Sequence, residues 1–166
     1  MDATSQIAAL AGPAAASVGL VVDGVELATA GGRARVLITV DLPEDQIGSA
    51  SLDSIADASR AIGAALDEAN VPDGAYVLEV GTPGVDRVLT ERRHFLRART
   101  RLVTLDLADG GTAAGRLLDL EGEELVLEGS ASLTRVPLAE VRAGRVEIEF
   151  RRLDDDAADD DADEER

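Results

Sequence analysis

Arginine is the residue type with the clearest chemistry in this sequence, because every one of the sixteen basic residues is an arginine. Six of them lie between positions 87 and 101, beside the single acid Glu91: Arg87, Arg92, Arg93, Arg97, Arg99 and Arg101. A guanidinium binds phosphate or carboxylate oxygens through two parallel hydrogen bonds. The chain as a whole has a formal net charge of −17. The cluster therefore predicts either a contact with RNA or pairing with the acidic surface of the protein itself.

Other reactive side chains are scarce. The sequence contains no lysine, no cysteine and one histidine, His94. These absences exclude a lysine Schiff base, the usual phosphate-binding loop, a thiolate nucleophile, a disulfide and a sulfur-ligated metal. His94 has no serine or acidic partner at the spacing of a known catalytic motif, so we interpret it as a surface or half-buried imidazole near a domain junction. We expect no catalytic residues, no metal and no cofactor, and a protein that is not an enzyme.

A second charged group lies in the C-terminal half. Glu121, Glu123 and Glu124 surround a predicted hairpin turn, and Asp106, Asp109, Asp119 and Glu128 lie in or beside the neighbouring strands. A negative surface attracts basic proteins and repels bare RNA. We therefore predict that these glutamates bind a basic protein, although ordinary solubility would explain any one of them equally well.

The first half of the chain reads as helices and strands. Residues 4–15 have an apolar helical face, with Thr4 and Ser5 as candidate caps and Gly12-Pro13 as a predicted end. The segment 20–42 predicts two strands joined at Gly31-Gly32, because a tight hairpin turn needs positive φ angles. Residues 36–40 are apolar on both faces, which is typical of a central strand.

A second helix and a third strand complete this half. Residues 51–69 place Leu52, Ile55, Ile62, Leu66 and Ala69 on one stripe, after Ser51 as the cap. Residues 76–80 alternate as a strand does. The order of these elements predicts an αββαβ domain.

Five short segments with a period of two follow the arginine cluster: "RLVTLDL", "TAAGRLLDL", "ELVLEG", "SLTRVPL" and "GRVEIEF". Glycine-containing turns separate most of them, which favours a small SH3-like or Sm-like five-stranded β-barrel. In the last segment we expect Val146, Ile148 and Phe150 to face the core. The fold class is therefore α+β, with an N-terminal α/β domain at residues 1–90 and the barrel at residues 91–152.

The two ends of the sequence carry no targeting signal that we accept. The uncharged run 7–22 is shorter than a membrane span, and Asp2 stands where a signal peptide carries a basic residue. The last thirteen residues contain nine acids and one arginine. Such a segment has too little apolar content to pack, so we expect residues 153–166 to be a disordered acidic tail.

The segment "YVLEVGTPGVDRVL", residues 76–89, carries a resemblance to a known family, the bacterial ribosome maturation factor RimP. The positions that agree are Tyr76, Leu78, Glu79, Val80, Pro83, Gly84, Asp86, Arg87 and Leu89. The chain departs from the family pattern at Gly81 and Thr82, where two serines are expected, and at Val88, where proline is expected. "HFLRA" at 94–98 and "VPLAEVRAGRVEIEF" at 136–150 also look like the family.

The resemblance implies a cytoplasmic, non-enzymatic factor that binds the immature 30S small ribosomal subunit and assists its assembly. It also implies that a basic small-subunit ribosomal protein binds the C-terminal barrel. The predicted ribosome-binding and RNA-binding residues are Arg92, Arg93, Arg97, Arg99 and Arg101, and the predicted protein-binding residues are Glu121, Glu123 and Glu124.

The motif around Pro83 and Gly84 leaves two roles open. A tight turn there would hold Asp86 and Arg87 in a fixed geometry, either to lock the two domains together or to present Arg87 to the ribosome. "GTPG" also matches the GxxG loop of KH domains, which gives the alternative of a general RNA-binding protein with KH-like and barrel modules. A KH loop joins two helices, whereas this one follows a predicted strand.

Overall fold

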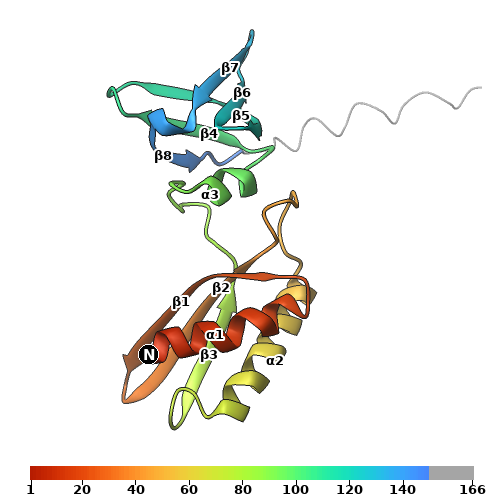
Figure 1. Cartoon of the computed structure of the whole chain (residues 1–166), viewed down its shortest axis with the longest axis vertical. Helices are drawn as coiled ribbons and strands as arrows, with labels where there is room; N and C mark the ends of the chain where they lie inside the picture. Colours follow the sequence, from red (N-terminus) through yellow and green to blue (C-terminus); the bar gives the residue numbers. More distant parts are fainter. Residues whose placement is uncertain (150–166) are drawn as a thin grey trace, which may run out of the picture.

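The computed structural model describes residues 1–149. Two modules lie end to end along the long axis of the molecule, joined by a linker after β3 (Figure 1). The α+β class predicted from the sequence is confirmed. The predicted acidic tail at residues 153–166 lies outside the described residues, as does Phe150. Within residues 1–149, no helix combines the length and the apolar character that a membrane span requires.

The first module contains two helices and a three-stranded sheet. Its elements, in chain order, are α1 (Ala3–Ala16), β1 (Val21–Ala30), β2 (Arg33–Asp41), α2 (Leu52–Ala69) and β3 (Tyr76–Gly81). The sheet order is β1-β2-β3, with β1 antiparallel and β3 parallel to β2. Gly31 and Gly32 have φ angles of 59° and 78° at the turn between β1 and β2, as the hairpin prediction requires.

The core of this module explains the central position of β2. Val36, Ile38 and Val40 are buried against Ile62 and Leu66 of α2, and α1 adds a set of side chains spaced four residues apart: Ile7, Ala11 and Ala15. Helix α1 packs on α2 and β1, and α2 packs on β3, so both helices contribute to one core. The strand that is apolar on both faces is therefore the middle strand of the sheet, as predicted.

Three sequence predictions for the helices are wrong in detail. Helix α1 does not end at Gly12-Pro13 but continues to Ala16, because Ala15 is fully buried in the core and its packing outweighs the hydrogen bond that proline cannot donate. Its cap is Asp2, whose carboxylate accepts a hydrogen bond from the Ser5 amide at 2.8 Å. In α2, Ser51 is the cap as predicted, but Leu52 is 85% exposed and Ala69 is also exposed, since both lie beyond the ends of the sheet-facing stripe.

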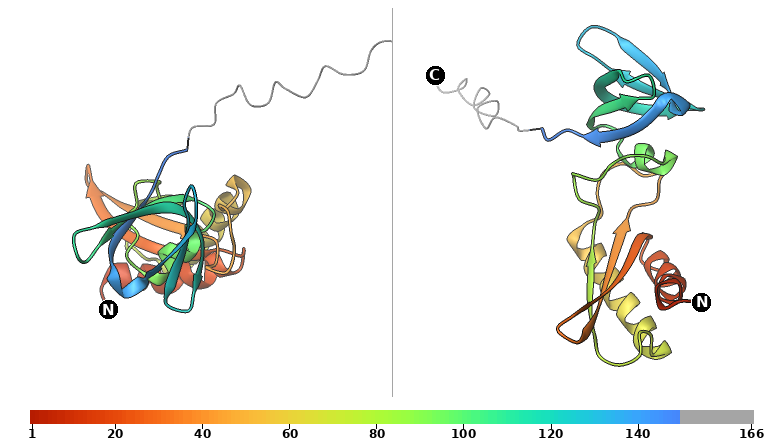
Figure 2. Two further views of the ribbon diagram at one scale, coloured as in Figure 1. Left: turned by 90° about the horizontal axis from the view of Figure 1, so that it is seen from above. Right: turned by 90° about the vertical axis from the view of Figure 1, so that its left-hand side faces the viewer.

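The second module contains a short helix, a five-stranded antiparallel sheet and a 3-10 turn: α3 (Arg92–Arg97), β4 (Leu102–Leu107), β5 (Thr112–Glu121), β6 (Glu124–Glu128), β7 (Leu133–Pro137), η1 (Leu138–Glu140) and β8 (Val141–Val146). The sheet order is β7-β6-β5-β4-β8. Figure 2 shows the strongly bent strands of this sheet above α3. Phe95 of α3 is fully buried in the core beneath the sheet.

The predicted closed barrel is not present. Among residues 1–149, the edge strands β7 and β8 are not paired with each other. The outer edge of β8 instead pairs with the linker, because Leu89 and Gly144 exchange two backbone hydrogen bonds of 2.7 and 2.8 Å. The last strand also begins earlier than predicted and ends at Val146, so Ile148 is 61% exposed rather than facing the core.

Candidate functional site at the junction of the two modules

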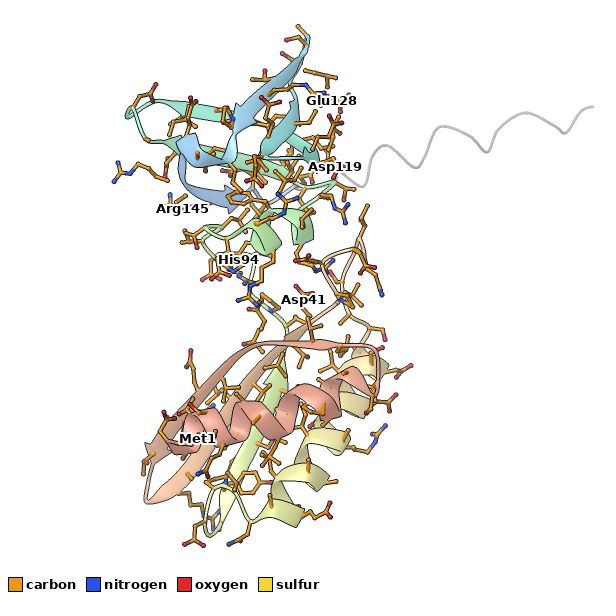
Figure 3. All side chains as sticks on the ribbon, viewed as in Figure 1. Met1, Asp41, His94, Asp119, Glu128 and Arg145 are labelled. Carbon is orange, nitrogen blue, oxygen red and sulfur yellow. The ribbon has the colours of Figure 1, made fainter. Side chains whose placement is uncertain are left out.

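The arginine cluster lies between the two modules, on the linker, on α3 and on the segment that follows α3. Figure 3 shows His94 and Asp41 on opposite sides of this junction. Helix α3 forms because Phe95 is buried beneath the sheet of the second module, which turns the other side chains of the helix toward the first module and toward β5 and β6. The arginines are therefore spread over different faces of the helix and its flanking segments.

Arg97 makes the most buried ion pair across the junction. Its Nη2 lies 2.8 Å from Oδ1 of Asp41, and the two side chains are only 10% and 13% exposed. The same guanidinium donates hydrogen bonds to the backbone carbonyls of Gln46 and Gly48. Asp41 ends β2, and residues 46 and 48 belong to the loop that follows it, so one side chain of α3 binds a whole corner of the first module.

Arg87 and Arg93 share a second carboxylate, which is partly buried. Asp23, in β1, lies 2.9 Å from Nη2 of Arg87 and 3.3 Å from Nη1 of Arg93, and its side chain is 16% exposed. Asp23 lies at an irregularity in the pairing of β1 with β2, between Val22 and Gly24. Such a bulge redirects a side chain relative to the regular strand. Here the carboxylate meets the arginines of the linker and of α3.

Arg99 and Arg92 also contact groups within the second module. Arg99 donates to the carbonyl of Glu44 at 3.0 Å and lies 3.5 Å from the carboxylate of Asp119, so it contacts both modules. Arg92 donates to the carbonyl of Gly122 at 2.6 Å and lies 3.3 Å from the carboxylate of Glu123. Arg101 is half-buried, and its side chain has no hydrogen bond or ion pair to any other group in residues 1–149.

The turn before Arg87 is built by Gly84 and Asp86. The Arg87 amide donates to the Gly84 carbonyl at 3.2 Å, which closes a four-residue turn. A Cβ atom on Gly84 would lie 2.6 Å from Oδ1 of Asp86, so a larger residue would displace that carboxylate. Pro83, which fixes φ just before this turn, lines the junction. These residues orient Arg87 toward Asp23.

His94 is a buried part of the junction, 8% exposed. Its Nδ1 accepts hydrogen bonds from the Thr90 and Glu91 amides, both at 3.1 Å. Burial, and then the neighbouring charge of Arg87, lower the pKa of His94 below its usual value of 6.5. The neutral imidazole therefore carries its hydrogen on Nε2, and its Nδ1 caps the N-terminal end of α3.

The predicted glutamates Glu121, Glu123 and Glu124 are exposed at the turn between β5 and β6. Two of them pair with Arg135 of β7, whose Nη1 lies 2.8 Å from Glu121 and 3.6 Å from Glu124. The guanidinium of Arg92 neutralises part of the charge of Glu123. The acidic turn is thus exposed but partly paired.

Sequence reasoning missed the two central carboxylates, Asp23 and Asp41. Their arginine partners are 64 and 56 residues away in the sequence. One signal was present, because six arginines in an acidic chain require nearby acids. Nothing in the sequence, however, distinguishes these two aspartates from the other acidic residues.

A compact α/β unit, a bent antiparallel sheet and a junction of partly buried arginine–aspartate pairs define a two-module protein whose arginines contact carboxylates across the junction. The sequence model of a protein family described as the RimP N-terminal domain matches residues 10–86 of this chain. The chain is also 37% identical over 155 residues to the ribosome maturation factor RimP of Kineococcus radiotolerans, and the alignment covers 84% of this chain and 74% of that relative. This chain belongs to the RimP family.

Proposed function

We propose that this protein is a maturation factor of the small ribosomal subunit, which binds the immature 30S particle in the cytoplasm and assists its assembly by binding rather than by catalysis. The observation that carries the proposal is the 37% identity to a relative named ribosome maturation factor RimP, spread over most of both chains. The absence of lysine and cysteine supports a non-enzymatic role, because two common nucleophiles are missing.

Sedimentation tests this proposal. The purified protein is layered with immature 30S particles, mature 30S particles and large subunits at several salt concentrations. We expect the protein to sediment with small subunits, most with immature ones, and to remain at the top of the gradient with large subunits. Equal sedimentation with small and large subunits would contradict the proposal and would favour a general RNA-binding protein.

For the RNA contact we propose a narrower set of arginines than the whole cluster. Arg92 is 46% exposed at its side chain, and Arg101 has no partner among residues 1–149, so both can meet a phosphate without breaking the junction. Arg87, Arg93, Arg97 and Arg99 would first have to leave their carboxylates and carbonyls. The intramolecular contacts of these four support the domain-locking role over direct RNA contact.

Substitution distinguishes the two groups of arginines. R92Q with R101Q should reduce the salt dependence of 30S binding, by about one unit of log–log slope for each phosphate that the protein no longer neutralises. R145Q, at an exposed arginine of β8, is the matched control and should leave the slope unchanged. An unchanged slope in the double variant would show that neither arginine contacts RNA.

We further propose that the acidic turn between β5 and β6 receives the basic ribosomal protein. Exposed carboxylates act mainly through long-range attraction, which sets the association rate. The triple variant E121Q, E123Q and E124Q should therefore associate more slowly with that protein at low salt and dissociate at a similar rate. The matched control replaces three acids of α2, D53N, D57N and E68Q. Equal association rates for the two triple variants would place the partner elsewhere.

A further inference from the structure

A cavity of about 120 Å³ lies at the junction, between the end of β2, the linker and α3. Its wall carries three arginines and one acid, together with the neutral polar side chains of a histidine, a serine and a threonine: Arg87, Arg97, Arg101, Asp41, His94, Ser49 and Thr82. A space of this size holds several water molecules or one small oxyanion. The cavity is independent of the surfaces proposed above for ribosomal RNA and protein, except that it shares Arg101.

One buried hydrogen-bond donor on a residue that lines this cavity lacks an acceptor. The Nε of Arg97 is buried and has no hydrogen-bond partner among residues 1–149, which is the one such side-chain atom in that part of the chain. A buried donor without a partner is costly, so it marks a place where an acceptor is missing. The Arg97 side chain as a whole is nine-tenths buried, so bulk water has little access to this atom.

Two further donors face no partner among the described residues. Arg101 makes no side-chain hydrogen bond or ion pair within residues 1–149, and the carboxylate of Glu149, which lies near it, is paired with Arg116. The Nδ1 of His94 accepts two backbone N–H groups, so its hydrogen is on Nε2, and no described group accepts from that nitrogen. The one acid on the wall, Asp41, accepts from Arg97 and from the Leu42 amide through Oδ1, so its negative charge is offset by the guanidinium of Arg97.

We propose that the junction cavity is a binding site for one small oxyanion of the phosphate class, held by Arg97, Arg101 and His94. Charge-assisted hydrogen bonds from guanidinium groups to an oxyanion are among the strongest in proteins. The bound anion would join α3 to the end of β2 and so would tighten the contact of the two modules. The site stands out because a chain of net charge −17 repels anions over most of its surface.

Calorimetric titration of the full chain with inorganic phosphate, at constant ionic strength kept with sodium chloride, tests the proposal. We expect saturable binding of one phosphate per chain. R101Q should weaken that binding by about tenfold or more, since it removes a charged donor. S49D is a second variant, because Ser49 lines the cavity and is exposed, so an added carboxylate there repels the anion without burying a charge. R145Q, outside the cavity, should bind as the parent does.

Three results would overturn the proposal. No saturable binding to the parent would mean that the cavity holds water alone. Equal weakening by R101Q and R145Q would mean that phosphate responds only to net charge. Phosphate binding that R101Q and S49D leave unchanged would mean that the ion binds outside the cavity.

Discussion

Arg97 and Asp41 are the pair on which the junction most depends, because both side chains are about nine-tenths buried. Removal of one member leaves the other charge buried and unpaired, which costs several kcal/mol. R97A should therefore lower the free energy of unfolding by about 3 kcal/mol, as measured by urea denaturation. The matched control is R60A, which breaks an exposed pair with Asp57 on α2 and should cost less than about 1 kcal/mol. Equal losses in the two variants would contradict the structural role of Arg97.

His94 gives a second prediction at the scale of single residues. Its pKa is lowered from 6.5 by burial and by Arg87. A lowered pKa means that the unfolded state binds the proton more readily, so the stability that His94 contributes is complete above pH 6.5 and is lost as the pH falls through the folded pKa. Proton NMR of this single histidine measures the value directly. A pKa at or above 6.5 would contradict the buried, neutral imidazole.

Tyr76 gives the opposite dependence at high pH. Burial and the 2.7 Å hydrogen bond to Asp67 raise the pKa of Tyr76 from 10.0 to about 12. The unfolded chain then loses the proton first, so stability is complete below pH 10 and falls as the pH rises toward 12. Because Tyr76 is the only tyrosine and the chain has no lysine or cysteine, tyrosinate absorbance reports this group alone. Ionisation at pH 10 in the folded protein would refute the prediction, and Y76F should remove this loss of stability.

At the scale of elements, the contact of the linker with β8 depends on Gly144. A Cβ atom there would lie 3.0 Å from both Leu105 and Phe95 and 3.4 Å from Leu89. G144A should therefore destabilise the second module by about 1–3 kcal/mol through overpacking. G12A is the control, because Gly12 is in α1 with nothing within 4 Å of its Cβ position. That substitution should be stabilising by about 0.5–1 kcal/mol, owing to helix propensity. If G144A and G12A changed the free energy of unfolding by the same amount and in the same direction, the close packing described around Gly144 would be contradicted.

The elements themselves were largely predictable, because their signals are local. The glycine pair at the first hairpin, the cap at Ser51 and the doubly apolar strand at 36–40 each determine structure over a few residues. Where burial competes with a local signal, the prediction was wrong: α1 continues through Pro13, and β8 ends before Ile148. The prediction of a closed barrel was also wrong, because the outer edge of β8 pairs with the linker residue Leu89 and not with another strand of the sheet.

At the scale of the whole molecule, the arginine cluster was visible in the sequence but its partners were not. The predicted residues Arg87, Arg93 and Arg97 do come together, at the junction of the two modules. Asp23 and Asp41 are brought to them only by the folding of the first module, across more than fifty residues of chain. Charge composition therefore predicts that such pairs exist, whereas only the structure identifies them.

The ion pairs of Asp23 and Asp41 with the arginines should fix the position of one module relative to the other. A measured distance between the two modules tests this claim. Because the chain has no cysteine, spin labels can be attached through A64C on α2 and L118C on β5, both at exposed positions. Pulsed electron–electron double resonance then measures the distance between the two labels. We expect one narrow distribution in the otherwise unchanged protein, and a broad one when D23N and D41N are added. The control pair D53N and D57N on α2 should leave the distribution narrow. A distribution that is broad from the start, or that stays narrow without Asp23 and Asp41, would contradict the role of the buried pairs.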